Sequence, residues 1–175
     1  MSRSGSSSSL PSPACGGGGG GSTASTPVGT PILHGVATQL DNALVGAQLT
    51  ERERRVVERL LSRLRSELGP GLLAVWLYGS RARGEADVEE TDPDRRSDVD
   101  LMVVVDPSRD ANELSWALIP LVNEAADAEG DSPVYYSVLV WSIDRLRDRR
   151  DIRSFFVQEV DRDKIVLHGS ALEAE

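Results

Sequence analysis

An uninterrupted apolar run, Leu72–Tyr78, constrains the fold of this chain more than any other feature. Seven residues without a charged side chain are typical of a β-strand that other elements cover on both faces. A second run of the same length, Val99–Val105, carries one charge at Asp100 and ends at Asp106-Pro107. These runs predict two neighbouring strands of a covered sheet.

Amphipathic helices are predicted on either side of these strands. Thr50 and Glu53 form a capping-box pair at the start of the first helix, and Gly69-Pro70 ends it. Its apolar face recurs at helical spacing through Val56, Val57, Leu60, Leu61, Leu64 and Leu68. A second helix is expected over about 111–129, with Pro120 kinking or interrupting it.

The sequence after residue 133 predicts one more strand, followed by further short elements. The strand covers residues 134–141, Ser142 caps a short helix, and Phe155 and Phe156 belong to another helix. Residues 164–168 fit a last edge strand. The order helix, strand, strand, helix, strand, helix, strand predicts an α/β (α+β) fold with a small sheet.

The N-terminal part of the chain differs in composition from the rest. Residues 1–47 hold 10 of the 16 glycines, and only Arg3 and Asp41 are charged. We expect a flexible tail over 1–47 with a weakly helical end, a domain over 48–170, and a short C-terminal tail over 171–175. The whole net charge of −9 belongs to the part after the tail.

Composition excludes several classes of function. With a net charge of −9 and a pI near 4.8, the chain is not expected to bind DNA or RNA through basic grooves. Cys15 is the only cysteine, which excludes an internal disulfide or a thiolate metal site. Since no apolar run is long enough to span a bilayer, no membrane partner is expected, and the predicted location is the cytoplasm.

Asp98 and Asp100 are the first candidates for chemistry. They lie two apart at the start of a strand, so both carboxylates project to the same face. Two carboxylates so close repel each other unless a cation lies between them, and oxygen ligands favour Mg²⁺. On its own, the pair fits a solvated strand entry equally well.

Gly79-Ser80 follows the first strand directly and is the second candidate. A strand that breaks at Gly-Ser into a helical turn offers backbone N–H groups and a hydroxyl to a phosphate. Arg81 or Arg83 could balance the phosphate charge. A tight strand-to-helix turn also favours Gly-Ser, but it does not explain the paired aspartates soon afterwards.

Together, residues 77–84 and 97–101 (LYGSRARG and SDVDL) resemble the polymerase-β-type nucleotidyltransferase family, most closely its minimal stand-alone bacterial members. The resemblance implies a small mixed sheet with helices packed mainly on one face. It also implies that Gly79 and Ser80 bind a nucleoside triphosphate, with Arg81 and Arg83 beside it. Asp98 and Asp100 would be catalytic and would hold Mg²⁺ or Mn²⁺.

The chain departs from this family in two places. The 17 residues between Ser80 and Asp98 exceed the usual spacer, and the excess, 87–96, should loop out. The third carboxylate of catalytic members aligns with Ser137, and serine can neither bind metal as an anion nor act as a base near neutral pH. An acid elsewhere, such as Glu89, Asp92 or Asp106, could replace it.

The resemblance implies a reaction in which a nucleoside monophosphate passes from an NTP, expected to be ATP, to an acceptor hydroxyl, with release of pyrophosphate. The acceptor is expected on a protein, because minimal relatives work beside a HEPN-type toxin as its antitoxin. The alternative is a catalytically weakened antitoxin or nucleotide-binding module that acts by binding such a partner.

Overall fold

The computed structural model describes residues 42–88, 90, 92 and 94–173, all within the second of two units, Met1–Pro31 and Ile32–Glu175. The helices are α2 (Glu51–Leu68), α3 (Gly79–Arg83), α4 (Ala111–Ala128), α5 (Ile143–Asp151) and α6 (Phe155–Asp163). The strands are β1 (Leu72–Tyr78), β2 (Val99–Val105), β3 (Tyr136–Ser142) and β4 (Ile165–Gly169). Three short 3₁₀ turns, η1 (Leu44–Gly46), η2 (Gly69–Gly71) and η3 (Pro133–Tyr135), connect them.

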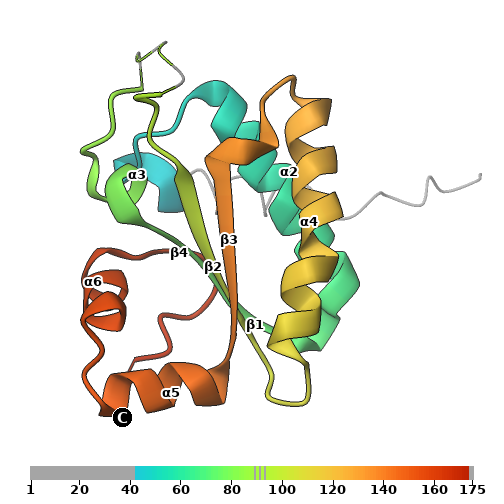
Figure 1. Cartoon of the computed structure of the whole chain (residues 1–175), viewed down its shortest axis with the longest axis vertical. Helices are drawn as coiled ribbons and strands as arrows, with labels where there is room; N and C mark the ends of the chain where they lie inside the picture. Colours follow the sequence, from blue (N-terminus) through green and yellow to red (C-terminus); the bar gives the residue numbers. More distant parts are fainter. Residues whose placement is uncertain (1–41, 89, 91, 93, 174–175) are drawn as a thin grey trace, which may run out of the picture. The chain divides into compact units, whose positions relative to one another are not determined.

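The four strands form one mixed sheet in the order β3-β2-β1-β4 (Figure 1). β1 pairs antiparallel with both β2 and β4, whereas β2 and β3 run parallel. The predicted mixed α+β fold is therefore confirmed. The two apolar runs, β1 and β2, are the central strands, which explains why both are buried on both faces.

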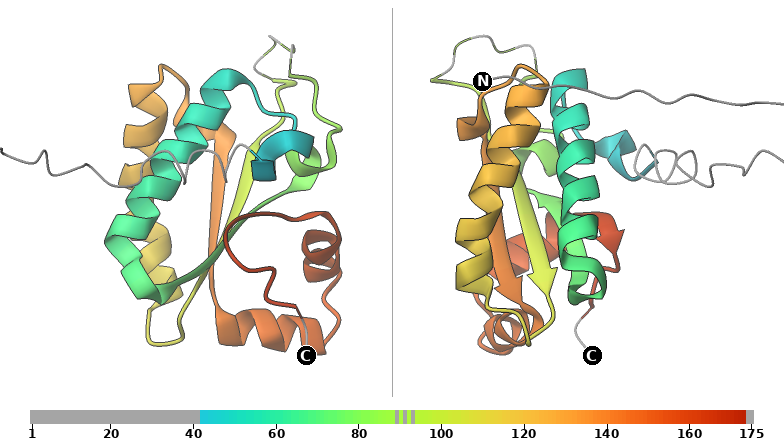
Figure 2. Two further views of the ribbon diagram at one scale, coloured as in Figure 1. Left: turned by 180° about the vertical axis from the view of Figure 1, so that it is seen from behind. Right: turned by 90° about the vertical axis from the view of Figure 1, so that its right-hand side faces the viewer.

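Each face of the sheet carries its own apolar core. The two long helices, α2 and α4, contact each other and cover one face, where Leu60, Leu77 and Val103 are fully buried (Figure 2). The short helices α5 and α6 cover part of the other face, around Trp76 and Met102. The helices thus lie mainly, but not exclusively, on one face.

The first helix forms as its sequence predicts. Thr50 and Glu53 make the reciprocal capping box, and α2 ends at Leu68, directly before Gly69. The packed domain begins earlier than residue 48, since Leu44 is fully buried and Ala47 is 7% exposed. Residues 1–41, which contain the predicted glycine-rich tail, lie outside the described residues.

One predicted boundary is wrong, whereas the helix predicted over about 111–129 forms without an interruption. Val134 and Tyr135 form a 3₁₀ turn after Pro133, so the third strand begins only at Tyr136. Pro120 does not interrupt α4, which continues to Ala128. Pro120 is exposed, so water can reach the carbonyl that loses its donor. In the described part of the chain, no helix is long and apolar enough to cross a membrane.

Candidate active site

Strand register brings three polar residues together at one end of the sheet. Asp100 on β2 lies opposite Tyr78 on β1 and opposite Ser137 on β3. Side chains alternate along a strand, so Asp100 shares the face of Met102 and Val104, which is the α5–α6 face. Asp98, two residues earlier, is exposed and directly precedes β2, and its charge acts on Asp100.

Gly79, the first residue of α3, borders this site directly after β1. Its φ of 76° lies in the left-handed region, and a Cβ on Gly79 would come within 2.6 Å of Oδ2 of Asp100. Glycine is therefore required twice, by the backbone conformation and by the close approach of the carboxylate. The predicted role of Gly79 in a close approach becomes a direct packing contact with Asp100.

The electrostatics of Asp100 are those of a carboxylate without a cation of its own. Burial raises its pKa, and the charge of Asp98 raises it further. A hydrogen bond from Ser137 and the positive charge of Arg83 oppose the shift without cancelling it. Added positive charge at this place would relieve the repulsion between the two aspartates.

Two of the other predicted ligands border the site. Ser80 is half-buried in the first turn of α3, and α3 has no side-chain cap at its N-terminus. Arg83 is exposed, and its guanidinium pairs with Glu85 at 2.7 Å and Asp163 at 3.2 Å. Since Arg83 acts on the pKa of Asp100, its charge is felt at the site.

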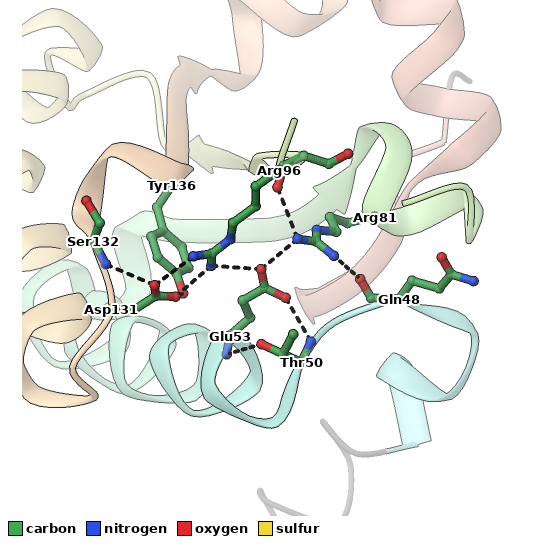
Figure 3. Close-up of polar contacts among 9 residues, drawn as sticks. Gln48, Thr50, Glu53, Arg81, Arg96, Asp131, Ser132 and Tyr136 are labelled. Atoms are coloured by element: carbon green, nitrogen blue, oxygen red, sulfur yellow. Dashed lines mark hydrogen bonds and ion pairs between the residues drawn. The ribbon is translucent and has the colours of Figure 1, made fainter. Parts of the chain in front are cut away.

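Arg81 does not line this site. Its side chain is 1% exposed and donates to Glu53 at 2.7 Å, with further bonds to the carbonyls of Gln48 and Ser97 (Figure 3). This correction has a physical reason: Arg81 neutralises Glu53, a carboxylate that is 0% exposed. We therefore assign Arg81 to the fold rather than to a phosphate.

A second arginine completes the same buried network. Arg96 bridges Glu53, at 2.9 Å, and Asp131, at 2.7 Å, and Tyr136 donates its hydroxyl to Asp131 (Figure 3). The hydrogen bond from Arg96 lowers the pKa of Asp131 to about 2. The end of the inserted loop is thus held to the N-terminus of α2 and to the segment before β3.

Ser137 occupies the place that its alignment predicted, beside Asp100 on the neighbouring strand. Asp106 follows the opposite end of β2, about 20 Å from Asp100 at 3.3 Å per residue, so it cannot supply the missing acid. Glu89 lies outside the described residues, and Asp92 is exposed. Among described residues, no cluster of three or more His, Cys, Asp or Glu could hold a metal ion.

Sequence reasoning missed the aromatic wall beside Asp100. The Tyr78 ring packs edge-on against Phe156 of α6, and Phe156 packs against Trp141 of β3. Burial and the nearby Asp100 charge raise the pKa of Tyr78 to about 12, so Tyr78 is a neutral donor at physiological pH. Only the alternation that places Tyr78 and Trp141 on one face could have indicated this contact.

A hollow of about 590 Å³ lies elsewhere. It is lined from α2 by Thr50, Arg52 and Arg55, and by Arg96 and Tyr135 across from them. Neither aspartate of the candidate site lines it. The site around Asp100 is therefore separate from this hollow.

No protein-family model matches the chain, and no curated protein matches it. Among solved structures, the crystal structure of a "putative nucleotidyltransferase from Sulfolobus solfataricus" is similar at 17% sequence identity. The match covers 79% of this chain and 90% of that chain, with a TM-score of 0.33. Similarity at this level does not assign the chain to a family.

Proposed function

We propose that this domain binds a nucleoside triphosphate with a divalent cation and transfers its nucleoside monophosphate to a hydroxyl of a protein partner. One observation carries the proposal: Asp100, which feels the charge of the nearby Asp98, packs against the glycine of a Gly-Ser turn. ATP is the proposed nucleotide, and Mg²⁺ or Mn²⁺ the proposed cation.

The donor set fits such a cation. Magnesium in phosphate-transfer sites is held by one or two carboxylates together with substrate phosphates and water. Asp98 and Asp100 supply two carboxylates, and burial, followed by the charge of Asp98, raises the pKa of Asp100. Bound there, the cation would neutralise triphosphate charge and polarise the α-phosphate.

The surrounding residues have defined tasks in this proposal. Ser80 and the turn at Gly79 would hold the leaving pyrophosphate, and Arg83 would add positive charge at the edge of the site. A bond forms between the acceptor oxygen and the α-phosphorus as the bond to the bridging oxygen breaks. Pyrophosphate takes the electron pair, and the acceptor proton passes to solvent.

A protein acceptor suits the open surroundings of the site. Asp98 and Ser137 are exposed, so a bulky acceptor can reach them. Phe156 contacts Tyr78 at the site, and the preceding residue, Phe155, is 76% exposed. Such an apolar corner suits a docking protein. The family resemblance, rather than a contact in the structure, supports a HEPN-type toxin as that protein.

Ser137 favours a second candidate function. Because serine is the residue beside Asp100, the strand next to Asp100 supplies no third carboxylate to take the acceptor proton. A module with this arrangement binds nucleotide and a partner without turnover. In that case the protein would act as an antitoxin-like binding module.

Label transfer separates the two functions. The chain is incubated with its co-expressed neighbour protein, Mg²⁺ and ATP labelled at either the α- or the γ-phosphate. Nucleotidyl transfer places the α-label, but not the γ-label, on protein, and Asp100→Ala abolishes it. Labelling that persists in Asp100→Ala rejects the enzymatic proposal, whereas nucleotide binding without labelling supports the second function.

A further inference from the structure

The side of α4 next to β3 carries no charge. Residues spaced three or four apart share one side of a helix, and they form a stripe here. The stripe comprises Asn112, Ser115, Trp116, Ile119 and Asn123. Trp116 is 75% exposed and Ile119 47%. The opposite flank of α4 is charged, since Glu124 pairs there with Arg63 of α2.

The strand beside this stripe is an unprotected edge. β3 has a strand neighbour on one side only within the described sheet. Its sequence from Tyr136 to Ser142 contains no charged residue and no proline. Edge strands usually carry such residues because free backbone N–H and C=O groups invite pairing with another chain.

A hollow lies between the helix stripe and the edge strand. Its volume is about 160 Å³, and it is lined by Ile119, Val122 and Asn123 of α4 and by Pro133, Tyr136 and Val138 of the β3 segment. A cavity of about 150 Å³ accommodates a benzene ring. The exposed Trp116 ring, one helical turn away, is a side chain of the kind that fills such a hollow.

From these features, we infer that a second copy of this chain docks on this face around a two-fold axis. The two β3 edges would pair antiparallel, and the two α4 helices would lie antiparallel beside each other. With Ile119 of both copies nearest the axis, positions at equal distances before and after Ile119 face each other. Trp116 of one copy, three residues before Ile119, therefore meets Val122 of the second copy, three residues after Ile119. Each indole thereby reaches the hollow of the opposite copy.

Two arguments favour a copy over another partner. A two-fold interface uses one patch twice, so the patch must contain both the projecting group and the hollow that receives it, as this one does. Two chains of net charge −9 repel each other, and the stripe together with β3 is a face on which no like charges meet.

Sedimentation equilibrium of the full chain tests the inference, independently of any nucleotide activity. We expect a dimer of the 18.9 kDa chain that Trp116→Glu converts to monomer, with a dissociation constant raised at least about 30-fold, as for a lost tryptophan hot spot. Ala117→Glu, the adjacent exposed position outside the stripe, should leave the dimer intact.

Several results would overturn it. The first is a wild-type chain that stays monomeric at 100 times the protein concentration used for nucleotide binding. The second is a dimer that survives Trp116→Glu. The third is a dimer that Ala117→Glu dissociates as strongly as Trp116→Glu does. Ile119→Asn serves as a milder second variant. A thermal melt of each variant shows that it remains folded.

Discussion

Two groups of acidic residues lie near the end of the sheet at which β2 and β3 begin, and they have opposite surroundings. Glu53 and Asp131 belong to the buried network, where Arg81 and Arg96 donate to them at 2.7–2.9 Å. Asp98 and Asp100 face each other's charge instead, and the pKa of Asp100 rises while that of Asp131 falls to about 2. Carboxylates with built-in cations serve the fold, whereas carboxylates without them are suited to a ligand that brings its own.

The largest expected loss of stability follows from breaking the buried pair of Arg81 and Glu53. Arg81→Met leaves the Glu53 carboxylate buried with less compensation, and breaking a buried pair costs about 3–5 kcal/mol. Urea unfolding should show this loss. The matched control is Arg83→Met on the same helix, whose guanidinium is exposed and whose pairs should contribute far less to stability. Equal losses for both variants would contradict the division between the two groups.

A smaller loss of stability is expected at Gly79, where the backbone contacts Asp100. Gly79 and Gly84 both have positive φ, 76° and 73°, but the nearest atom to a Cβ on Gly84 is 3.8 Å away. Gly84→Ala should therefore cost only the backbone strain, about 1 kcal/mol. Gly79→Ala adds the clash with Asp100 and should cost about 3 kcal/mol.

Nucleotide titration of the same two glycine variants sharpens the result. Displacement of Asp100 should weaken nucleotide binding by Gly79→Ala, whereas Gly84→Ala should bind as the wild type does. Similar stability losses in the two variants would show that the Asp100 contact does not constrain Gly79.

Acid titration distinguishes the two regions by sign. The folded pKa of Asp131 is lowered from 3.8 to about 2, so its stabilisation is complete above pH 3.8 and is lost as pH falls through about 2. The folded pKa of Asp100 is raised, so its ionisation destabilises the fold above that pKa.

Variants make this contrast measurable as pH-dependent stability differences of opposite sign. At pH 7, Asp131→Asn should be less stable than the wild type and Asp100→Asn more stable. The Asp100→Asn difference should vanish as pH falls through the ordinary range of Asp. A less stable Asp100→Asn would mean that its charge already has a partner.

The smallest stability effect is expected at Ser137. Ser137→Asp adds a like charge beside Asp100 and should destabilise the metal-free domain by about 0.2–1 kcal/mol. It should also bind Mn²⁺ more tightly and increase transfer of the α-label. Ser137→Asn is the uncharged control, and equal metal affinities of the two variants would count against a metal at this edge.

The sequence predicts the strands well because β1 and β2 are apolar throughout, and it predicts Ser137 beside Asp100 through the family alignment. It does not predict the burial of Arg81, since an arginine after Gly-Ser usually remains exposed. The partner, Glu53, lies 28 residues earlier. A signal was present: Glu53 lies at helical spacing before Val56, Val57 and Leu60, which places a carboxylate on the buried face.

The most direct test of the proposed nucleotide site is calorimetric titration with ATP in the presence and absence of Mg²⁺. The wild-type protein should bind ATP only in the presence of Mg²⁺. The variants Asp98→Asn and Asp100→Asn should lose this binding. Asp106→Asn, at the opposite end of β2, should bind as the wild type does. Metal-dependent binding that is unchanged in both site variants would contradict the assignment of Asp98 and Asp100.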